Sequence, residues 1–187
     1  MEPSPRLIYV AALWVCACSG GAQKSPSGTA PALAPAEKVG VEMTLPRLGG
    51  GEVAVGKLRG RPVVLVLFTT GPLQCQKEAR DFVRLHQRYG KQVHFLGIAL
   101  DSHTNLAMIS AFVEVAGYLF HVLLATPTDL ELVGGIGQTS VVPRTVLLDR
   151  AGRTIQDHVG RTDFNRLVVG IEGQLRGTRT PRATVIP

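Results

Sequence analysis

Residues 61–80, RPVVLVLFTTGPLQCQKEAR, decide the fold of this chain. The apolar, β-branched run at 62–68 predicts a buried strand, and the TTGP that follows at 69–72 predicts a tight connection. From residue 73 onward, apolar residues recur at helical spacing, which predicts an amphipathic helix. Cys75 lies in the first turn of that helix and is the one cysteine that we expect inside a folded domain.

The composition fits one ordinary domain with extensions. Of the 187 residues, 45% are hydrophobic and 18% are charged, so there is enough apolar material for a core. The net charge is +6, but the basic residues are spread along the chain and aromatic residues make up only 5%. This pattern gives little support to a nucleic-acid partner, and we expect none.

The first residues are typical of an export signal. Arg6 supplies a short positive region, and residues 7–15 form an apolar core of the length that secretion requires. Residues 1–17 resemble a bacterial lipoprotein signal peptide, with VCAC at 15–18 as the lipobox and Cys18 as the acylated first residue. We therefore expect an exported lipoprotein, held by a lipid anchor on the periplasmic side of the envelope, at the outer membrane. An ordinary cleaved signal peptide is the alternative.

The rest of the chain divides by composition into three parts. Residues 18–38 are rich in Ala, Pro, Gly and Ser and predict a flexible tether, residues 39–177 have the pattern of a folded domain, and residues 178–187 form a C-terminal tail. The domain pattern predicts strands at 43–46, 52–55, 62–68, 93–100, 120–125, 145–148 and 153–159, and helices at 73–90, 104–115, 129–133 and 163–177. Alternating strands and helices indicate an α/β layered domain.

Two segments carry a more specific resemblance. Together with the order of elements, VVLVLFTTGPLQCQKEA at 63–79 and VVPRTVLLDRAGRTIQDHVG at 141–160 resemble the TlpA/ResA-type envelope thiol-disulfide proteins of the AhpC/TSA–Redoxin superfamily. The resemblance covers about residues 39–177. It implies a thioredoxin-like three-layer fold with a central mixed β-sheet flanked by helices, in which Pro143 is a cis-proline facing the active site.

The active-site motif of that family is incomplete in this chain. Its chemistry needs two thiols spaced C-x-x-C at a helix N-terminus, where the first attacks a substrate disulfide and the second releases the product. Cys75 matches the second cysteine, whereas the first position is Pro72 and the tryptophan usual before it is Gly71. The resemblance thus implies a residual thiol at Cys75 beside an active-site-like cleft made of Thr70, Gly71, Pro72, Val142 and Pro143.

Three functions remain open for this scaffold. The first is an envelope thiol-disulfide protein whose dithiol activity is impaired, leaving Cys75 to form mixed disulfides. The second is a non-catalytic module that holds an extended peptide or a protein partner in the cleft, with Cys75 as an inert buried hydrophobe. The third, a peroxiredoxin-like peroxidase, has the least support, because its threonine and arginine positions fall on Pro72 and Pro143, although Arg144 is adjacent.

The remaining polar residues suggest structural roles. The five histidines lack metal-ligand spacing, and we expect no metal and no cofactor. We expect Asp101 to cap the helix that follows it. Basic residues recur every three or four positions on the helix at 73–90 and predict a solvated positive face with Glu78 and Asp81 as local partners; docking on anionic lipid or an acidic partner is the alternative. These are Lys77, Arg80, Arg84, Arg88 and Lys91.

Overall fold

The computed structural model describes residues 40–133, 136 and 141–177. The predicted signal peptide at 1–17, the acylation site Cys18, the tether at 18–38 and the tail at 178–187 lie outside the described residues. Within the described part, no helix combines the length and the hydropathy that a membrane crossing needs.

A five-stranded mixed sheet forms the centre of the domain, in the order β5-β4-β3-β6-β7. β3 pairs in parallel with β4, which pairs in parallel with β5, while β3–β6 and β6–β7 are antiparallel. The strands are β3 (Val63–Phe68), β4 (His94–Ala99), β5 (His121–Leu124), β6 (Arg144–Leu148) and β7 (Thr154–Val159). This arrangement confirms the predicted α/β fold with a central mixed sheet.

The middle strand explains why the segment at 61–80 organises the chain. All six residues of β3 are buried, because helices and loops cover both faces of the sheet at this position. A strand buried on both faces has no polar positions, which is why VVLVLF is continuously apolar rather than alternating.

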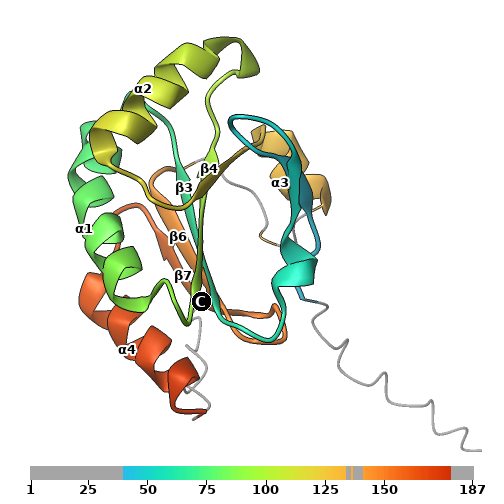
Figure 1. The fold of residues 1–187 in the computed structure, drawn as a ribbon, viewed down its shortest axis with the longest axis vertical. Helices are drawn as coiled ribbons and strands as arrows, with labels where there is room; N and C mark the ends of the chain where they lie inside the picture. The colour runs from blue at the N-terminus through green and yellow to red at the C-terminus, as the bar shows by residue number, and fades with distance from the viewer. Residues whose placement is uncertain (1–39, 134–135, 137–140, 178–187) are drawn as a thin grey trace, which may run out of the picture. The chain divides into compact units, whose positions relative to one another are not determined.

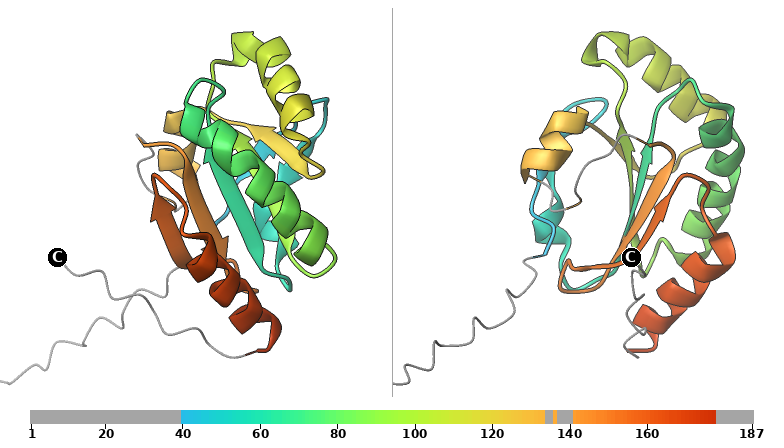
Figure 2. Two further views of the ribbon diagram at one scale, coloured as in Figure 1. Left: turned by 90° about the vertical axis from the view of Figure 1, so that its left-hand side faces the viewer. Right: turned by 180° about the vertical axis from the view of Figure 1, so that it is seen from behind.

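Two layers cover the sheet (Figures 1 and 2). One face carries α1 (Leu73–Tyr89), α2 (Leu106–Ala116) and α4 (Phe164–Leu175). The other face carries α3 (Pro127–Val133), the hairpin of β1 (Thr44–Pro46) and β2 (Glu52–Ala54), and the 3-10 turn η1 (Val55–Leu58). Each layer encloses its own apolar cluster, and Cys75 belongs to the cluster under α1, α2 and α4.

The predicted elements are present, with small differences at their ends. The helix expected at 104–115 begins later, because a 3-10 turn, η2 (His103–Asn105), precedes α2. Asp163, the first residue of the helix expected at 163–177, is the N-cap of α4 and accepts a hydrogen bond from the Arg166 backbone N–H. The hairpin between β6 and β7 turns at residues 149–152, where Gly152 adopts a φ of 81° that favours glycine.

Candidate functional site

The candidate site lies where two loops meet at the carboxyl end of β3. The first loop, residues 69–72, leads from β3 into α1. The second ends in Pro143, directly before β6, and the peptide bond between Val142 and Pro143 is cis, which confirms the expected geometry. Because Leu67 is registered with Arg144, the antiparallel pairing sets Pro143 opposite the last residue of β3. The two predicted halves of the cleft thus lie at the same end of the sheet, and a groove beside the first loop is lined by Thr70 and Gly71 but not by Pro72, Val142 or Pro143.

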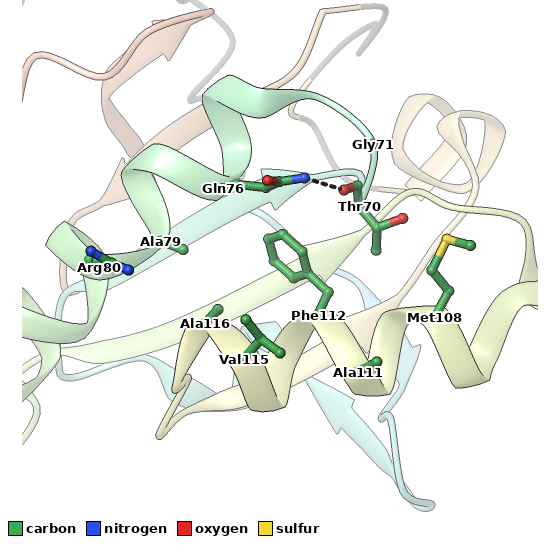
Figure 3. A pocket seen from close by; sticks show the side chains of 10 residues that line it. All are labelled: Thr70, Gly71, Gln76, Ala79, Arg80, Met108, Ala111, Phe112, Val115 and Ala116. Carbon is green, nitrogen blue, oxygen red and sulfur yellow. Dashed lines mark hydrogen bonds between the residues drawn. The ribbon is translucent and has the colours of Figure 1, made fainter.

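Asp101 holds the first loop in place. Its carboxylate accepts hydrogen bonds from the Thr70 backbone N–H at 3.1 Å and from the Thr70 hydroxyl at 2.8 Å. The Gln76 side chain donates to the Thr70 carbonyl at 3.3 Å (Figure 3). The expectation that Asp101 caps the next helix is wrong: Ser102 fills that position and accepts from the Thr104 backbone. Asp101 instead links the end of β4 to the candidate loop.

Gly71 and Pro72 are exposed at the start of α1. Pro72 is the N-cap of the helix, in an extended conformation with φ −64°, and its carbonyl accepts from the Cys75 backbone N–H at 3.1 Å. Among the described residues no side chain caps this helix, and its first turn holds no acidic residue. The proline thus occupies the solvent-facing position at which the resemblance places the attacking thiol.

Cys75 lies beneath that position, in the apolar core. Its side chain is 2% exposed and packs in the same cluster as Phe82 and the partly buried Val142. Burial raises the pKa of the Cys75 thiol; the nearby charges of Glu78 and Asp101 add to this rise, and a hydrogen bond from the Thr69 backbone opposes it. At neutral pH the group is a protonated thiol, which is a poor nucleophile.

Glu78 was expected on the solvated face of α1, and this expectation is wrong. Its side chain is 3% exposed and accepts hydrogen bonds from the Thr162 backbone N–H at 3.0 Å, the Thr162 hydroxyl at 2.8 Å and the Gln74 amide at 2.7 Å. The Thr162 hydroxyl is also 2.9 Å from that of buried Thr145 on β6. Glu78 follows Cys75 by three positions, so helical periodicity places both on the inner face, a signal that could have located it.

Tyr118 is a second residue near Cys75 that the sequence did not single out. Its ring stacks on Phe120 with centroids 4.5 Å apart and meets Phe68 edge-on. Burial raises the pKa of Tyr118, with smaller contributions from Cys75 and Glu78. The neighbours of the Cys75 thiol are therefore the protonated phenol of Tyr118 and apolar side chains. None of these neighbours is a cation that would stabilise a thiolate.

Arg144 does not reach the thiol. Side chains alternate along β6, and Val146 and Leu148 pack in the cluster under the β1–β2 hairpin, whereas Leu147 packs in the cluster that holds Cys75. Arg144 shares the face of Val146. Its guanidinium binds the Asp157 carboxylate at 2.7 and 2.9 Å and the Ile136 carbonyl at 2.7 Å. The arginine that a peroxidase would need beside its cysteine is therefore turned to the opposite face of the sheet.

The basic face of α1 is exposed, as predicted. Arg84 pairs with Asp81 at 3.2 Å, which confirms Asp81 as a local partner, and Arg88 pairs with Glu172 of α4 at 3.2 Å. The full set is Lys77, Arg80, Arg84, Arg88 and Lys91.

Two histidines lie inside the domain rather than at the candidate site. His86 packs edge-on against Phe95 and Phe120, and His158 is 3.3 Å from the Gln156 side chain. Burial lowers the pKa of both groups. Over the described residues, no three His, Cys, Asp or Glu side chains are grouped to hold a metal ion.

Comparison with known proteins gives a family match. The model of the AhpC/TSA family matches residues 37–157. A search of curated proteins finds no match to this chain.

Solved structures of thioredoxin-like proteins resemble the domain. A DsbF homologue from Corynebacterium diphtheriae is 20% identical, with a TM-score of 0.66 over 81% of this chain and 97% of the other. A thioredoxin-family thiol:disulfide interchange protein from Chlorobium tepidum is 20% identical, with a TM-score of 0.62 over 73% and 94%. A secreted disulfide oxidoreductase from Mycobacterium tuberculosis, homologous to E. coli DsbE, is 18% identical, with a TM-score of 0.60 over 74% and 99%. At these identities the likeness establishes the thioredoxin-like fold.

Proposed function

Because this chain belongs to the AhpC/TSA family and keeps a single, buried cysteine at its candidate site, we propose that it is an exported thioredoxin-like protein whose thiol-disulfide chemistry is impaired. In place of catalysis, the cleft between residues 70–72 and the Val142–Pro143 loop binds an extended segment of a protein partner in the envelope. A dithiol cycle needs a second thiol to release each mixed disulfide, and the position for the attacking thiol is Pro72.

One observation carries this proposal: the Cys75 side chain is 2% exposed and its pKa is raised. Thiol-disulfide exchange requires an accessible thiolate, since the thiolate is the attacking form and must reach the substrate sulfur. Burial of Cys75 opposes both the accessibility of its sulfur and the formation of its thiolate. Mixed-disulfide formation by Cys75 is therefore slow in the native state.

Two features of the first loop support the proposed binding. Gly71 is exposed, and a Cβ placed on it meets no atom within 4 Å, so an approaching backbone has open space there. Asp101 and Gln76 fix the conformation of Thr70 in advance, which lowers the entropy cost of binding. An extended peptide lying between Gly71 and Pro143 could pair with exposed backbone groups, as in other peptide-binding domains.

Restoration of the missing thiol tests this function. In the full chain with Cys16→Ser and Cys18→Ser, Cys75 is the single thiol, and we expect no reduction of insulin disulfides. Adding Pro72→Cys to that background should create a C-x-x-C pair at the helix start and produce measurable activity. The same background with Pro72→Ser is the matched control and should stay inactive. Turnover by the parent chain at the rate of the Pro72→Cys variant would overturn the proposal.

We further propose that the protein is a lipoprotein acylated at Cys18 and held at the outer membrane. The support is the lipobox-like VCAC at 15–18 and the polar, Pro- and Gly-rich residues that follow it. Cells expressing the chain should incorporate radioactive palmitate into it, and Cys18→Ser should abolish the label. A labelled Cys18→Ser variant, or an unlabelled parent protein, would refute the anchor. Sucrose-gradient separation of the two membranes then tests the outer-membrane assignment.

A further inference from the structure

α2 is an apolar helix that the fold leaves mostly uncovered. Its sequence, LAMISAFVEVA, has one charged residue, and only Ile109 is fully buried. Met108 is 58% exposed and Val115 is 90% exposed. A helix at the surface of a domain normally presents a polar outer face, and a helix that is apolar on all sides is normally covered. The composition of α2 thus indicates a second contact beyond the domain itself.

A groove of about 470 Å³ runs between α2 and α1, next to the candidate cleft (Figure 3). On the side of α2, its wall is apolar, and Phe112 points from α2 into the space between the two helices. On the side of α1, the wall is more polar. The lining residues are Thr70, Gly71, Gln76, Ala79 and Arg80 on one side and Met108, Ala111, Phe112, Val115 and Ala116 on the other.

Arg80, at the wall of this groove, is a cation that the described residues leave without a partner. Elsewhere on α1, Arg84 pairs with Asp81 and Arg88 pairs with Glu172. Across the part of the chain that the structure describes, Arg80 has no carboxylate within ion-pair distance and no hydrogen-bond partner. Lys77, one turn earlier, is also exposed and without an ion pair in the same part. A partner that is complementary to this groove would present an apolar surface with a carboxylate at its edge.

The shape and charge of the surface select among possible occupants. The apolar wall on α2 runs from Met108 to Ala116, over about two turns of helix, and Met108 and Val115 are exposed along it, so the wall is open to a partner that lies along the helix. A second copy of this chain would bring two positive faces of α1 together, which costs free energy. A membrane surface is flat and would leave the groove unfilled. An amphipathic helix can lay its apolar face in a groove between two helices and present an acidic side chain to Arg80.

We propose that the groove between α1 and α2 docks an amphipathic helix of a partner protein, with its apolar face on Met108, Phe112 and Val115 and an acidic side chain on Arg80. This surface is separate from the cleft at Pro143, although both border on Gly71. The docking of a helix therefore stands whether or not the cleft binds an extended segment.

Two synthetic helices that differ only in charge test the proposal. Each has about 20 residues, enough to be helical, with one stripe of leucine and alanine flanked by glutamate in the first peptide and by lysine in the second. Fluorescence anisotropy of the labelled peptides is measured against the full-length protein. We expect the glutamate helix to bind at least about tenfold more tightly than the lysine helix, a difference of about 1.4 kcal/mol. Added salt should narrow the difference.

Three variants locate the binding. Arg80→Glu should reverse the preference, so that the lysine helix binds better. Ala111→Trp should fill the groove and weaken both helices, and the exposure of Ala111 makes a folded variant the expected result. Lys91→Glu changes the net charge by the same amount beyond the other end of α1 and should leave the preference unchanged.

Several results would overturn the proposal. These are equal affinity for the two helices, absence of binding by either, or binding that Ala111→Trp leaves intact. Concentration-dependent dimerisation, or binding to phosphatidylglycerol vesicles in the absence of helix binding, would assign the surface to a second copy or to a membrane instead. None of these readouts depends on the cleft, so a Pro143→Ala variant that keeps helix binding would separate the two sites.

Discussion

The buried carboxylate of Glu78 should be a major source of stability for the arrangement around Cys75. Removing the side chain by Glu78→Ala deletes three hydrogen bonds and leaves the Thr162 backbone N–H without a partner inside the protein. Hydrogen bonds to a charged group contribute about 1.5–3 kcal/mol each, and part of this gain is offset because a buried carboxylate loses hydration. We therefore expect a loss of about 3–5 kcal/mol in the free energy of unfolding.

Glu78→Gln should cost far less, because the hydroxyl of Thr162 can change its role. In the native protein, this hydroxyl donates to the carboxylate and lies 2.9 Å from the Thr145 hydroxyl. With glutamine present, the amide oxygen can accept from the Thr162 N–H, and the amide NH₂ can donate to the Thr162 hydroxyl, which then donates to Thr145. The expected cost is about 1 kcal/mol.

Urea unfolding followed by circular dichroism measures these changes, with Glu114→Ala as the control. Glu114 is exposed on α2, so its loss should change stability by less than about 0.5 kcal/mol. In thermal scans, Glu78→Ala should lower Tm by about 10 °C. If Glu78→Gln lowers the free energy of unfolding as much as Glu78→Ala does, the proposed change of role of the Thr162 hydroxyl is wrong. If Glu78→Ala changes the free energy of unfolding no more than Glu114→Ala does, the stabilising role of buried Glu78 is wrong.

Two further predictions concern the pH dependence of stability. Burial raises the pKa of Cys75 in the folded protein. Below the unfolded pKa of about 8.5, the thiol is protonated in both states and does not lower the free energy of unfolding. At higher pH the unfolded chain loses this proton first, so the free energy of unfolding should fall by up to about 1.4 kcal/mol per pH unit. Urea unfolding of the parent chain, measured below and above a pH of about 8.5, should show this fall in the free energy of unfolding. The same fall in the Cys75→Ala variant would contradict its assignment to Cys75. Burial lowers the pKa of His86, whose Nδ1 is buried without a partner in the described part of the chain, so this group favours unfolding as pH falls below about 6.5. His86→Leu should flatten the acid side of the stability curve, and an unchanged slope would exclude His86 as a contributor.

Local sequence patterns were sufficient for much of the fold and for the position of the site. The short, β-branched apolar run of β3 favours a strand covered on both faces, and Asp163 is a residue type favoured at the start of a helix. The resemblance supplied the cis bond at Pro143, which local propensity would have assigned as trans. These features depend on neighbours in the sequence or on the family.

The roles of three charged residues depend on contacts that are distant in sequence. Glu78 is 84 positions from Thr162, Asp101 is 31 positions from Thr70, and Arg144 is 13 positions from Asp157. A charged residue on a helix or at a strand end is solvated by default, and only its tertiary partner makes burial favourable. The helical spacing of Glu78 from Cys75 pointed inward, but the sequence did not identify the threonine that satisfies its carboxylate.

The central claim is that Cys75 is a buried, protonated thiol that does not exchange with disulfides. Its most direct test is the intact mass of the native full chain, carrying Cys16→Ser and Cys18→Ser, after incubation with excess oxidised glutathione at neutral pH. We predict an unmodified mass for the native protein and one glutathione adduct after the same incubation in denaturant. Rapid formation of the adduct on the native protein would contradict the claim and assign a redox function to Cys75.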